Sequence, residues 1–190
     1  AHDFDLLELP DTVPDITDMF SNPSKILLYS DPFLGMFDHA VTVHAHTPYA
    51  EYAEKLAAAK KRAGEYAYLF DAAEKLCRLL EVKAYLGVRT REAYQSDSRR
   101  ELASVADDYA EAERRLDDFF AAFSVQLHTV NKPFGFEVHC ARLGGVKQRL
   151  VYCRNRLLAY LSGAIDGIEE LQENILPHNP DLPDNFLMND

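Results

Sequence analysis

The chain has 190 residues, with 31 acidic and 20 basic side chains and a formal net charge of −11 at pH 7. This length fits one domain of ordinary size with a sizeable core. The acidic balance makes nucleic acids and anionic membrane surfaces poor partners, and no apolar run reaches the roughly 18 residues that a membrane helix needs.

Both ends of the chain differ from its middle. Residues 1–22 are acidic and contain proline but no lysine or arginine, and residues 177–190 are proline-rich and acidic. The first residue is Ala1, not Met, and no secretory signal follows it. We therefore interpret residues 1–22 as a linker from an upstream domain, residues 23–176 as a helical domain and residues 177–190 as a tail.

Two short elements precede the long helices. Asn22 followed by Pro23 places a cap residue and a proline at the first helical position, and Asp31-Pro32 repeats the device. The first predicts a short helix through Tyr29, and the second predicts another turn through residues 33–37. Helices this short are unstable alone, so they must pack onto the rest of the domain.

Apolar residues then recur at helical spacing through most of the chain. They predict long helices near 48–62, 65–95, 98–130 and 141–176, and the first two are compatible with one kinked helix. Helix 65–95 is apolar over a wide arc, which predicts a place in the middle of the domain. Ser98 and Glu101 have the spacing of a capping box. The predicted fold is all-α, an antiparallel bundle of three to four long helices with short helical turns on its N-terminal side.

The segment 131–139 separates the two longest periodic runs. Pro133 cannot lie inside a helix, and Gly135 is a second helix breaker, so this segment predicts a hinge between antiparallel helices. Its phenylalanines, Phe134 and Phe136, are unusual in a connection. They either cap one end of the bundle or form a docking knob for another surface.

The sequence gives weak signals for chemistry, and we assign no catalytic residue, no metal and no cofactor. Cys77 and Cys153 fall on apolar helix positions and are predicted to be buried thiols in a reducing compartment. No Glu is followed three residues later by His, as a di-metal bundle would require. His44 and His46 are interpreted as a surface pair. A nucleophile and base formed by His139 and Cys140 is a minor alternative.

The first half of the last long helix combines glycine with positive charge. Gly144 and Gly145 are interpreted as admitting another backbone near a helix start, with an anion bound at that start as the alternative. We predict that Arg154 or Arg156 pairs with an acidic side chain of the preceding helix, and a basic patch for a ligand is the alternative. The cations of this segment are Arg142, Lys147, Arg149, Arg154 and Arg156, and the predicted acidic partners are Glu113, Asp117 and Asp118.

Large apolar residues between 49 and 85 exceed what one core needs. Their helical positions spread over a broad arc, and large exposed apolar patches are rare on monomers. This surplus predicts a two-fold contact between copies that buries more than about 1,000 Å². The candidate interface residues are Tyr49, Tyr52, Tyr66, Tyr68, Phe70 and Tyr85.

Several motifs resemble one family. Asn131-Lys132-Pro133-Phe134-Gly135-Phe136-Glu137-Val138 with Arg142-Leu143-Gly144-Gly145 is similar to a signature in the C-terminal helical domain of bacterial glycoside hydrolase family 20 exo-β-N-acetylglucosaminidases. Similar pieces follow in order over residues 22–176, with departures at 127–130 and 139–141. They are Asn22-Pro23-Ser24-Lys25, Asp31-Pro32-Phe33-Leu34-Gly35-Met36-Phe37-Asp38, Glu65-Tyr66-Ala67-Tyr68-Leu69-Phe70, Lys83-Ala84-Tyr85-Leu86-Gly87-Val88-Arg89 and Arg91-Glu92-Ala93-Tyr94-Gln95.

The resemblance implies a role for the chain. In those enzymes a (β/α)8 barrel upstream carries the Asp-Glu pair of a substrate-assisted hydrolysis, and the helical domain forms much of a homodimer interface. The chain is then expected to be a non-catalytic dimerisation and scaffold domain of a cytoplasmic bacterial β-N-acetylhexosaminidase. Its expected partners are its own upstream barrel and a second copy. The alternative is a stand-alone helical module that binds a carbohydrate or an anion.

Overall fold

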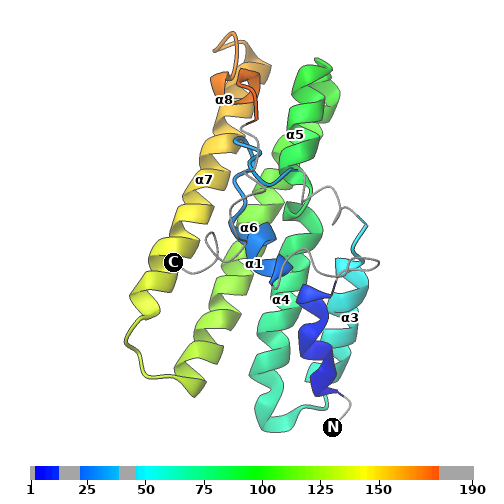
Figure 1. The fold of residues 1–190 in the computed structure, drawn as a ribbon, viewed down its shortest axis with the longest axis vertical. Helices are drawn as coiled ribbons and strands as arrows, with labels where there is room; N and C mark the ends of the chain where they lie inside the picture. Colours follow the sequence, from blue (N-terminus) through cyan, green and yellow to red (C-terminus); the bar gives the residue numbers. More distant parts are fainter. Residues whose placement is uncertain (1–2, 13–21, 39–45, 176–190) are drawn as a thin grey trace, which may run out of the picture.

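The computed structural model describes residues 3–12, 22–38 and 46–175 (Figure 1). All regular secondary structure in these ranges is helical, so the all-α prediction is confirmed. The α-helices are α1 (Pro23–Tyr29), α3 (Tyr49–Lys60), α4 (Ala67–Lys83), α5 (Leu86–Gln95), α6 (Arg99–Val130), α7 (Phe136–Ser162) and α8 (Glu169–Gln172); the 3-10 helices are η1 (Phe4–Asp11) and η3 (Gly64–Tyr66).

The long helices form two antiparallel pairs, α3 with α4 and α6 with α7 (Figure 1). Helices α4 and α6 pack against each other in the middle, and α5 extends from the end of α4 toward the opposite end of the bundle. The connections at residues 61–66 and 131–135 therefore lie at the same end, which is lowest in Figure 1. We call it the hinge end.

Some helix boundaries differ from the prediction. The run predicted over 65–95 is interrupted between α4 and α5, and the run predicted over 141–176 begins earlier and ends at Ser162. Gly163 has φ 76° there, and its N–H donates to the Tyr160 carbonyl at 3.1 Å, which stops the helix. The chain then folds back so that Ile168 and Leu171 enter the core.

The predicted capping box is wrong. Ser98 precedes α6 as its N-cap residue but makes no side-chain capping bond. The carboxylate of Glu101 instead accepts a hydrogen bond from Arg89 at 2.8 Å, so the charged partner on α5 takes the place of the Ser98 N–H.

Two apolar cores lie on either side of α4. The first surrounds the fully buried Tyr109 of α6 and includes Leu79 of α4 and Leu150 of α7. The second lies among α1, α3 and α4 and includes Phe70 and Leu80. Helix α4 contributes to both cores, which confirms that it occupies the middle of the domain.

Part of the segment interpreted as a linker is folded. Its residues 4–11 form η1, which packs against α3 and α4 over the second core. The predicted division of the chain at residue 22 stays a prediction, and the predicted tail at residues 177–190 lies outside the described residues.

The predicted short elements on the N-terminal side are present. Asn22 accepts a hydrogen bond from Lys25 N at 3.4 Å and begins α1. The carboxylate of Asp31 accepts bonds of 2.9 Å from the N–H groups of Phe33 and Leu34 and forms the next turn. We call residues 30–34 the Asp31 turn. Side chains from α4, α5 and α7 bind this turn.

Buried Lys83 binds the end of α1 and the start of the Asp31 turn. Its side chain is 3% exposed, and its Nζ donates to the carbonyls of Leu27 at 2.8 Å and Ser30 at 2.9 Å. Burial lowers the pKa of Lys83 to about 8, against the opposing effects of Asp31 and Cys153. The amine therefore supplies donors to backbone carbonyls that α1 leaves without helical partners.

Two arginines hold the rest of the Asp31 turn. Arg149 of α7 donates to the Asp31 carboxylate at 2.6 and 3.1 Å. Burial raises the pKa of Asp31, but the bonds from Arg149 and the two backbone amides outweigh it and leave the pKa below its usual value. Arg91 of α5 is 6% exposed and donates to the carbonyls of Phe33 and, at 3.2 Å, Leu171.

Gly87 lets α5 lie directly against the Asp31 turn. A Cβ atom at this position would be 2.8 Å from the carbonyl oxygen of Pro32 and 3.0 Å from its Cα. Both are backbone atoms, which cannot move aside as a flexible side chain can.

We expect Lys83→Met to lower the free energy of unfolding by about 2 kcal/mol, because the Ser30 carbonyl would lose the amine donor and the Leu27 carbonyl would keep only the Ser30 hydroxyl at 3.1 Å. The measurement is urea denaturation at pH 7. The matched control is Lys55→Met, which removes an exposed pair with Glu51 and should change stability by less than about 0.5 kcal/mol. Equal effects of the two substitutions would show that Lys83 does not hold the turn.

The stabilising effect of Lys83 should depend on pH. Its pKa is about 8 in the folded chain and 10.5 in the unfolded one, so between these values the unfolded state binds the additional proton and stability rises with pH. From pH 7 to 9 the wild type should gain about 1 kcal/mol relative to Lys83→Met. Unfolding curves of the two proteins that shift in parallel over this range would contradict the assignment.

Gly87→Ala should destabilise the domain by about 2 kcal/mol or more, because the new methyl group meets the Pro32 backbone. Gly144→Ala is the control, since no described atom lies within 4 Å of its Cβ position in α7. It should stabilise by about 0.5–1 kcal/mol through helix propensity. Thermal unfolding of both variants tests the pair, and a tolerated Gly87→Ala would mean that α5 is not pressed against this turn.

Candidate functional site

The hinge is shorter than the predicted segment 131–139. Gly135 has φ 92°, which favours glycine, and α7 begins at the next residue, Phe136. The Glu137 carboxylate accepts a hydrogen bond from Gly135 N at 2.9 Å. This bond satisfies a free N–H at the helix start, so the helix forms earlier than the sequence pattern indicates.

The two hinge phenylalanines differ in their surroundings. Phe136 stacks on Phe120 with 5.8 Å between ring centroids and meets His128 edge-on at 4.6 Å. Phe134 is 87% exposed. Phe136 therefore caps the end of the α6–α7 pair, whereas Phe134 fits the alternative of a docking knob.

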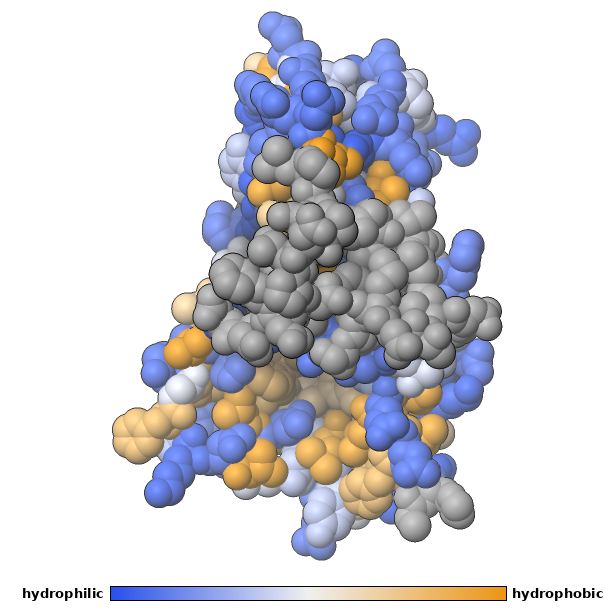
Figure 2. All heavy atoms as spheres, viewed as in Figure 1, coloured by the Kyte–Doolittle hydropathy of each residue, from blue (hydrophilic) through white to orange (hydrophobic). Residues whose placement is uncertain are grey.

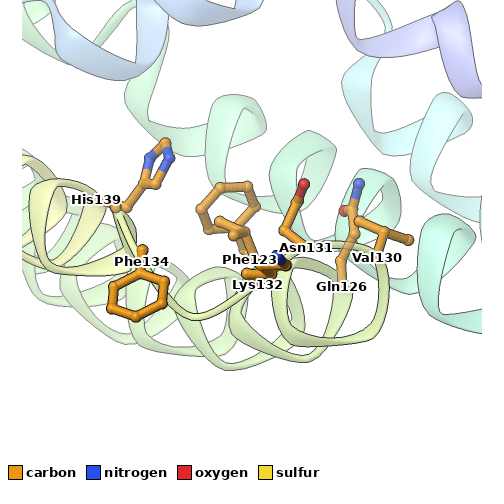
Figure 3. A pocket seen from close by; sticks show the side chains of 9 residues that line it. Phe123, Gln126, Val130, Asn131, Lys132, Phe134 and His139 are labelled. Atoms are coloured by element: carbon orange, nitrogen blue, oxygen red, sulfur yellow. The ribbon is translucent and has the colours of Figure 1, made fainter.

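An open hollow of about 470 Å³ lies beside the hinge (Figure 3). The rings of Phe123 and His139 meet edge-on at 5.2 Å and form an aromatic wall, and Phe134 lies at its edge. Such a surface can receive an apolar side chain while the surrounding polar groups bind backbone atoms. The lining residues are Phe123, Gln126, Leu127, Val130, Asn131, Lys132, Phe134, Gly135 and His139.

The other motif residues near the hinge lie on the surface of α7. Arg142, Gly144 and Gly145 are exposed. No described atom lies within 4 Å of a Cβ built on either glycine, so the predicted close approach of another backbone is wrong within the described chain. The alternative of an anion at a helix start also fails, because α7 begins at Phe136, about two turns earlier.

The predicted ion pairs between α6 and α7 have a different register. Lys147 pairs with Asp117 at 2.6 Å, while Arg156 pairs with Glu169 beyond the end of α7. Because α6 and α7 are antiparallel and Lys147 is level with Asp117, Arg154 lies beyond the level of the predicted carboxylates on α6. The prediction that Arg154 or Arg156 contacts Glu113, Asp117 or Asp118 is not supported by any of these pairs.

Most of the aromatic candidates for an interface are packed within the chain. Tyr49, Tyr52 and Phe70 are buried in the second core because η1 and α1 cover them. Tyr66 is 45% exposed, and Tyr68 and Tyr85 are partly exposed. The predicted contact between copies stays a prediction.

Sequence reasoning missed one aromatic residue, Phe4. It is 44% exposed and meets the Tyr66 ring edge-on at 5.5 Å. The stretch around Phe4 is acidic and contains proline, which predicts a linker, so this ring is absent from the predicted interface residues. The signal was an isolated apolar cluster at residues 4–9.

The cysteines are free thiols. Cys77 and Cys153 are buried as predicted, and burial raises the pKa of each to about 12, which makes them poor nucleophiles. Of the predicted surface pair, His46 is exposed and His44 lies outside the described residues. The ring of His139, the proposed base for Cys140, packs on Phe123.

Within residues 3–12, 22–38 and 46–175, no group of three or more His, Cys, Asp or Glu side chains could hold a metal ion. No helix in those ranges is both long enough and apolar enough to cross a membrane.

Comparison with protein families gives a match over nearly the whole chain. The family model described as Glycoside Hydrolase 20C C-terminal domain matches residues 2–188. No curated protein matches the chain. The match includes the motifs around the Asp31 turn and the hinge, and it extends over the ends that were interpreted as linker and tail. The chain belongs to the glycoside hydrolase 20C C-terminal domain family.

Proposed function

We propose that this chain is the non-catalytic scaffold and dimerisation domain of a glycoside hydrolase family 20 β-N-acetylhexosaminidase, an enzyme that releases terminal N-acetylglucosamine. An upstream (β/α)8 domain of the same polypeptide supplies the catalytic Asp-Glu pair. The free thiols suit the reducing interior of a bacterial cell, where we place the enzyme.

The family-like motifs support a scaffold role because they converge on the Asp31 turn. Lys83 and Arg91, from two of these motifs, donate to backbone carbonyls of this turn, and Gly87 lies against Pro32. Lys83 and Arg91 are both buried, and their hydrogen bonds hold the Asp31 turn in place. That residues of these motifs hold the fold together is the single observation on which the proposal depends.

The alternative of an anion-binding module has less support. It would use the cations between residues 142 and 156. Lys147 is paired with Asp117, and Arg149 is paired with both Asp31 and Glu170, at 2.5 Å for the latter. Arg156 is paired with Glu169. An anion that binds at any of these three cations would have to displace a carboxylate.

The activity of the chain and of its parent protein tests the first half of the proposal. We expect the purified 190-residue chain to leave p-nitrophenyl N-acetyl-β-glucosaminide intact, while the full-length parent hydrolyses it. Release of p-nitrophenol is followed by absorbance. Hydrolysis by the 190-residue chain, or an inactive parent, would contradict the assignment.

The mass of the 190-residue chain in solution tests the second half. Light scattering at micromolar concentration should give twice the chain mass of 21.5 kDa. The physical reason is that partly exposed aromatic side chains such as Tyr68 and Tyr85 gain free energy on burial between copies. A mass of 21.5 kDa at every concentration up to about 100 µM would assign dimerisation to another part of the enzyme.

A further inference from the structure

Large exposed apolar side chains gather at the hinge end. Phe4 and Tyr66 lie at the side formed by η1 and the connection before α4, and Val130, Phe134 and Val138 lie around the hinge. Figure 2 shows hydrophobic side chains over the lower part of one face, on both sides of a hollowed surface. Exposed apolar side chains that gather on one surface mark a contact with another protein surface more often than side chains scattered singly.

The first described residues of the chain lie at the same end. The Asp3 carboxylate accepts hydrogen bonds from Arg62, just after α3, at 3.0 and 3.1 Å. The next residue, Phe4, packs on Tyr66 and, with 5.6 Å between centroids, on Phe70. Asp3 and Phe4 are thereby fixed beside the connection before α4, at the end of the bundle that also carries the hinge (Figure 1).

The geometry points to the hinge end as the surface on which the upstream domain of the same polypeptide docks, with Phe134 as the central apolar anchor. This inference rests on the proposed function, which supplies the upstream domain. The upstream domain precedes this chain in the polypeptide, and the first described residues, Asp3 and Phe4, lie beside Tyr66 at the hinge end. Phe4 and Tyr66 contact it at one side, and Phe134 contacts it at the other.

The dimensions fit an interface between domains. The four helices α7, α6, α4 and α3 lie side by side (Figure 1), and at 8–10 Å between helix axes they span roughly 30 Å. The end of the bundle is thus long enough for Phe4 at one side and Phe134 at the other to contact the same domain. The hinge hollow adds a recess in which an apolar side chain of the upstream domain is buried beside Phe134.

A covalent connection favours the upstream domain over a second copy. A flexible covalent linker can hold its partner at an effective concentration in the millimolar range. A free second copy at micromolar concentration is present at roughly a thousandfold lower level. The upstream domain of the same polypeptide therefore covers this apolar surface before a second copy can. Tyr66, a candidate for the contact between copies, becomes part of this contact within one chain.

Photocrosslinking in the full-length parent enzyme tests the inference. The variant Phe134→p-benzoylphenylalanine keeps an aromatic ring at an exposed site, so the fold is retained. The control is Leu158→p-benzoylphenylalanine, because Leu158 is 44% exposed near the opposite end of α7. Irradiation of a mixture of ¹⁴N- and ¹⁵N-labelled enzyme, followed by mass spectrometry of the linked peptides, separates links within a chain from links between chains.

We expect the probe at position 134 to link to upstream peptides of the same chain, at least tenfold more often than the probe at position 158. Links from position 134 mainly to another copy, or to no upstream peptide, would overturn the inference. Hydrolysis of the p-nitrophenyl substrate by the same preparation is measured separately. An active enzyme without the upstream link refutes only the docking surface, whereas an inactive parent refutes the proposed function.

Phe134→Ser gives a second, independent measurement in the full-length enzyme. Loss of the anchor should make limited proteolysis between the two domains at least tenfold faster, because the joining segment is exposed more often. Leu158→Ser should leave the cleavage rate unchanged. Equal cleavage rates for Phe134→Ser and the wild type would count against the docking surface.

Discussion

The bond from a buried amine to the end of a short helix is the interaction on which this structure most depends. The end of α1 leaves carbonyl groups without helical partners, and the buried amine of Lys83 donates to those of Leu27 and Ser30. Arg91 donates to the Phe33 carbonyl and Arg149 donates to the Asp31 carboxylate, so both also hold the Asp31 turn. With this turn fixed, α1 covers one face of α4, and the domain can have two cores.

The residues that stabilise the fold and the residues that are exposed for contact with another domain lie in different parts of the molecule. The buried cations and the Gly87 contact are in the middle of the molecule, where α1, α4, α5 and α7 meet at one turn. The exposed aromatic rings are at the hinge end, where side chains such as Phe134 contribute little to the folded chain. Residues at that end are therefore free to change a contact with another domain while the core keeps its shape. That combination suits a scaffold within a larger enzyme.

The family-like motifs gain a physical explanation from the fold. The Asp31-Pro32 segment is far in the sequence from Lys83, Gly87 and Arg91, yet these residues meet it at one turn. The hinge motif has a different role, because Phe136 caps the α6–α7 pair and Phe134 remains exposed. The family-like motifs thus include residues that hold the fold and residues that remain exposed for a partner.

The sequence by itself determined the all-α class, the short capped elements, the hinge and the family, because helix periodicity, proline and glycine act through local geometry. It also indicated the central place of α4 from its wide apolar arc. Only the tertiary structure decided that Tyr49 and Tyr52 are buried while Phe134 is exposed, because burial depends on which other segments cover a helix face. The same holds for the pairing of Lys147 with Asp117, since a small shift between two long helices changes every charged partner along them.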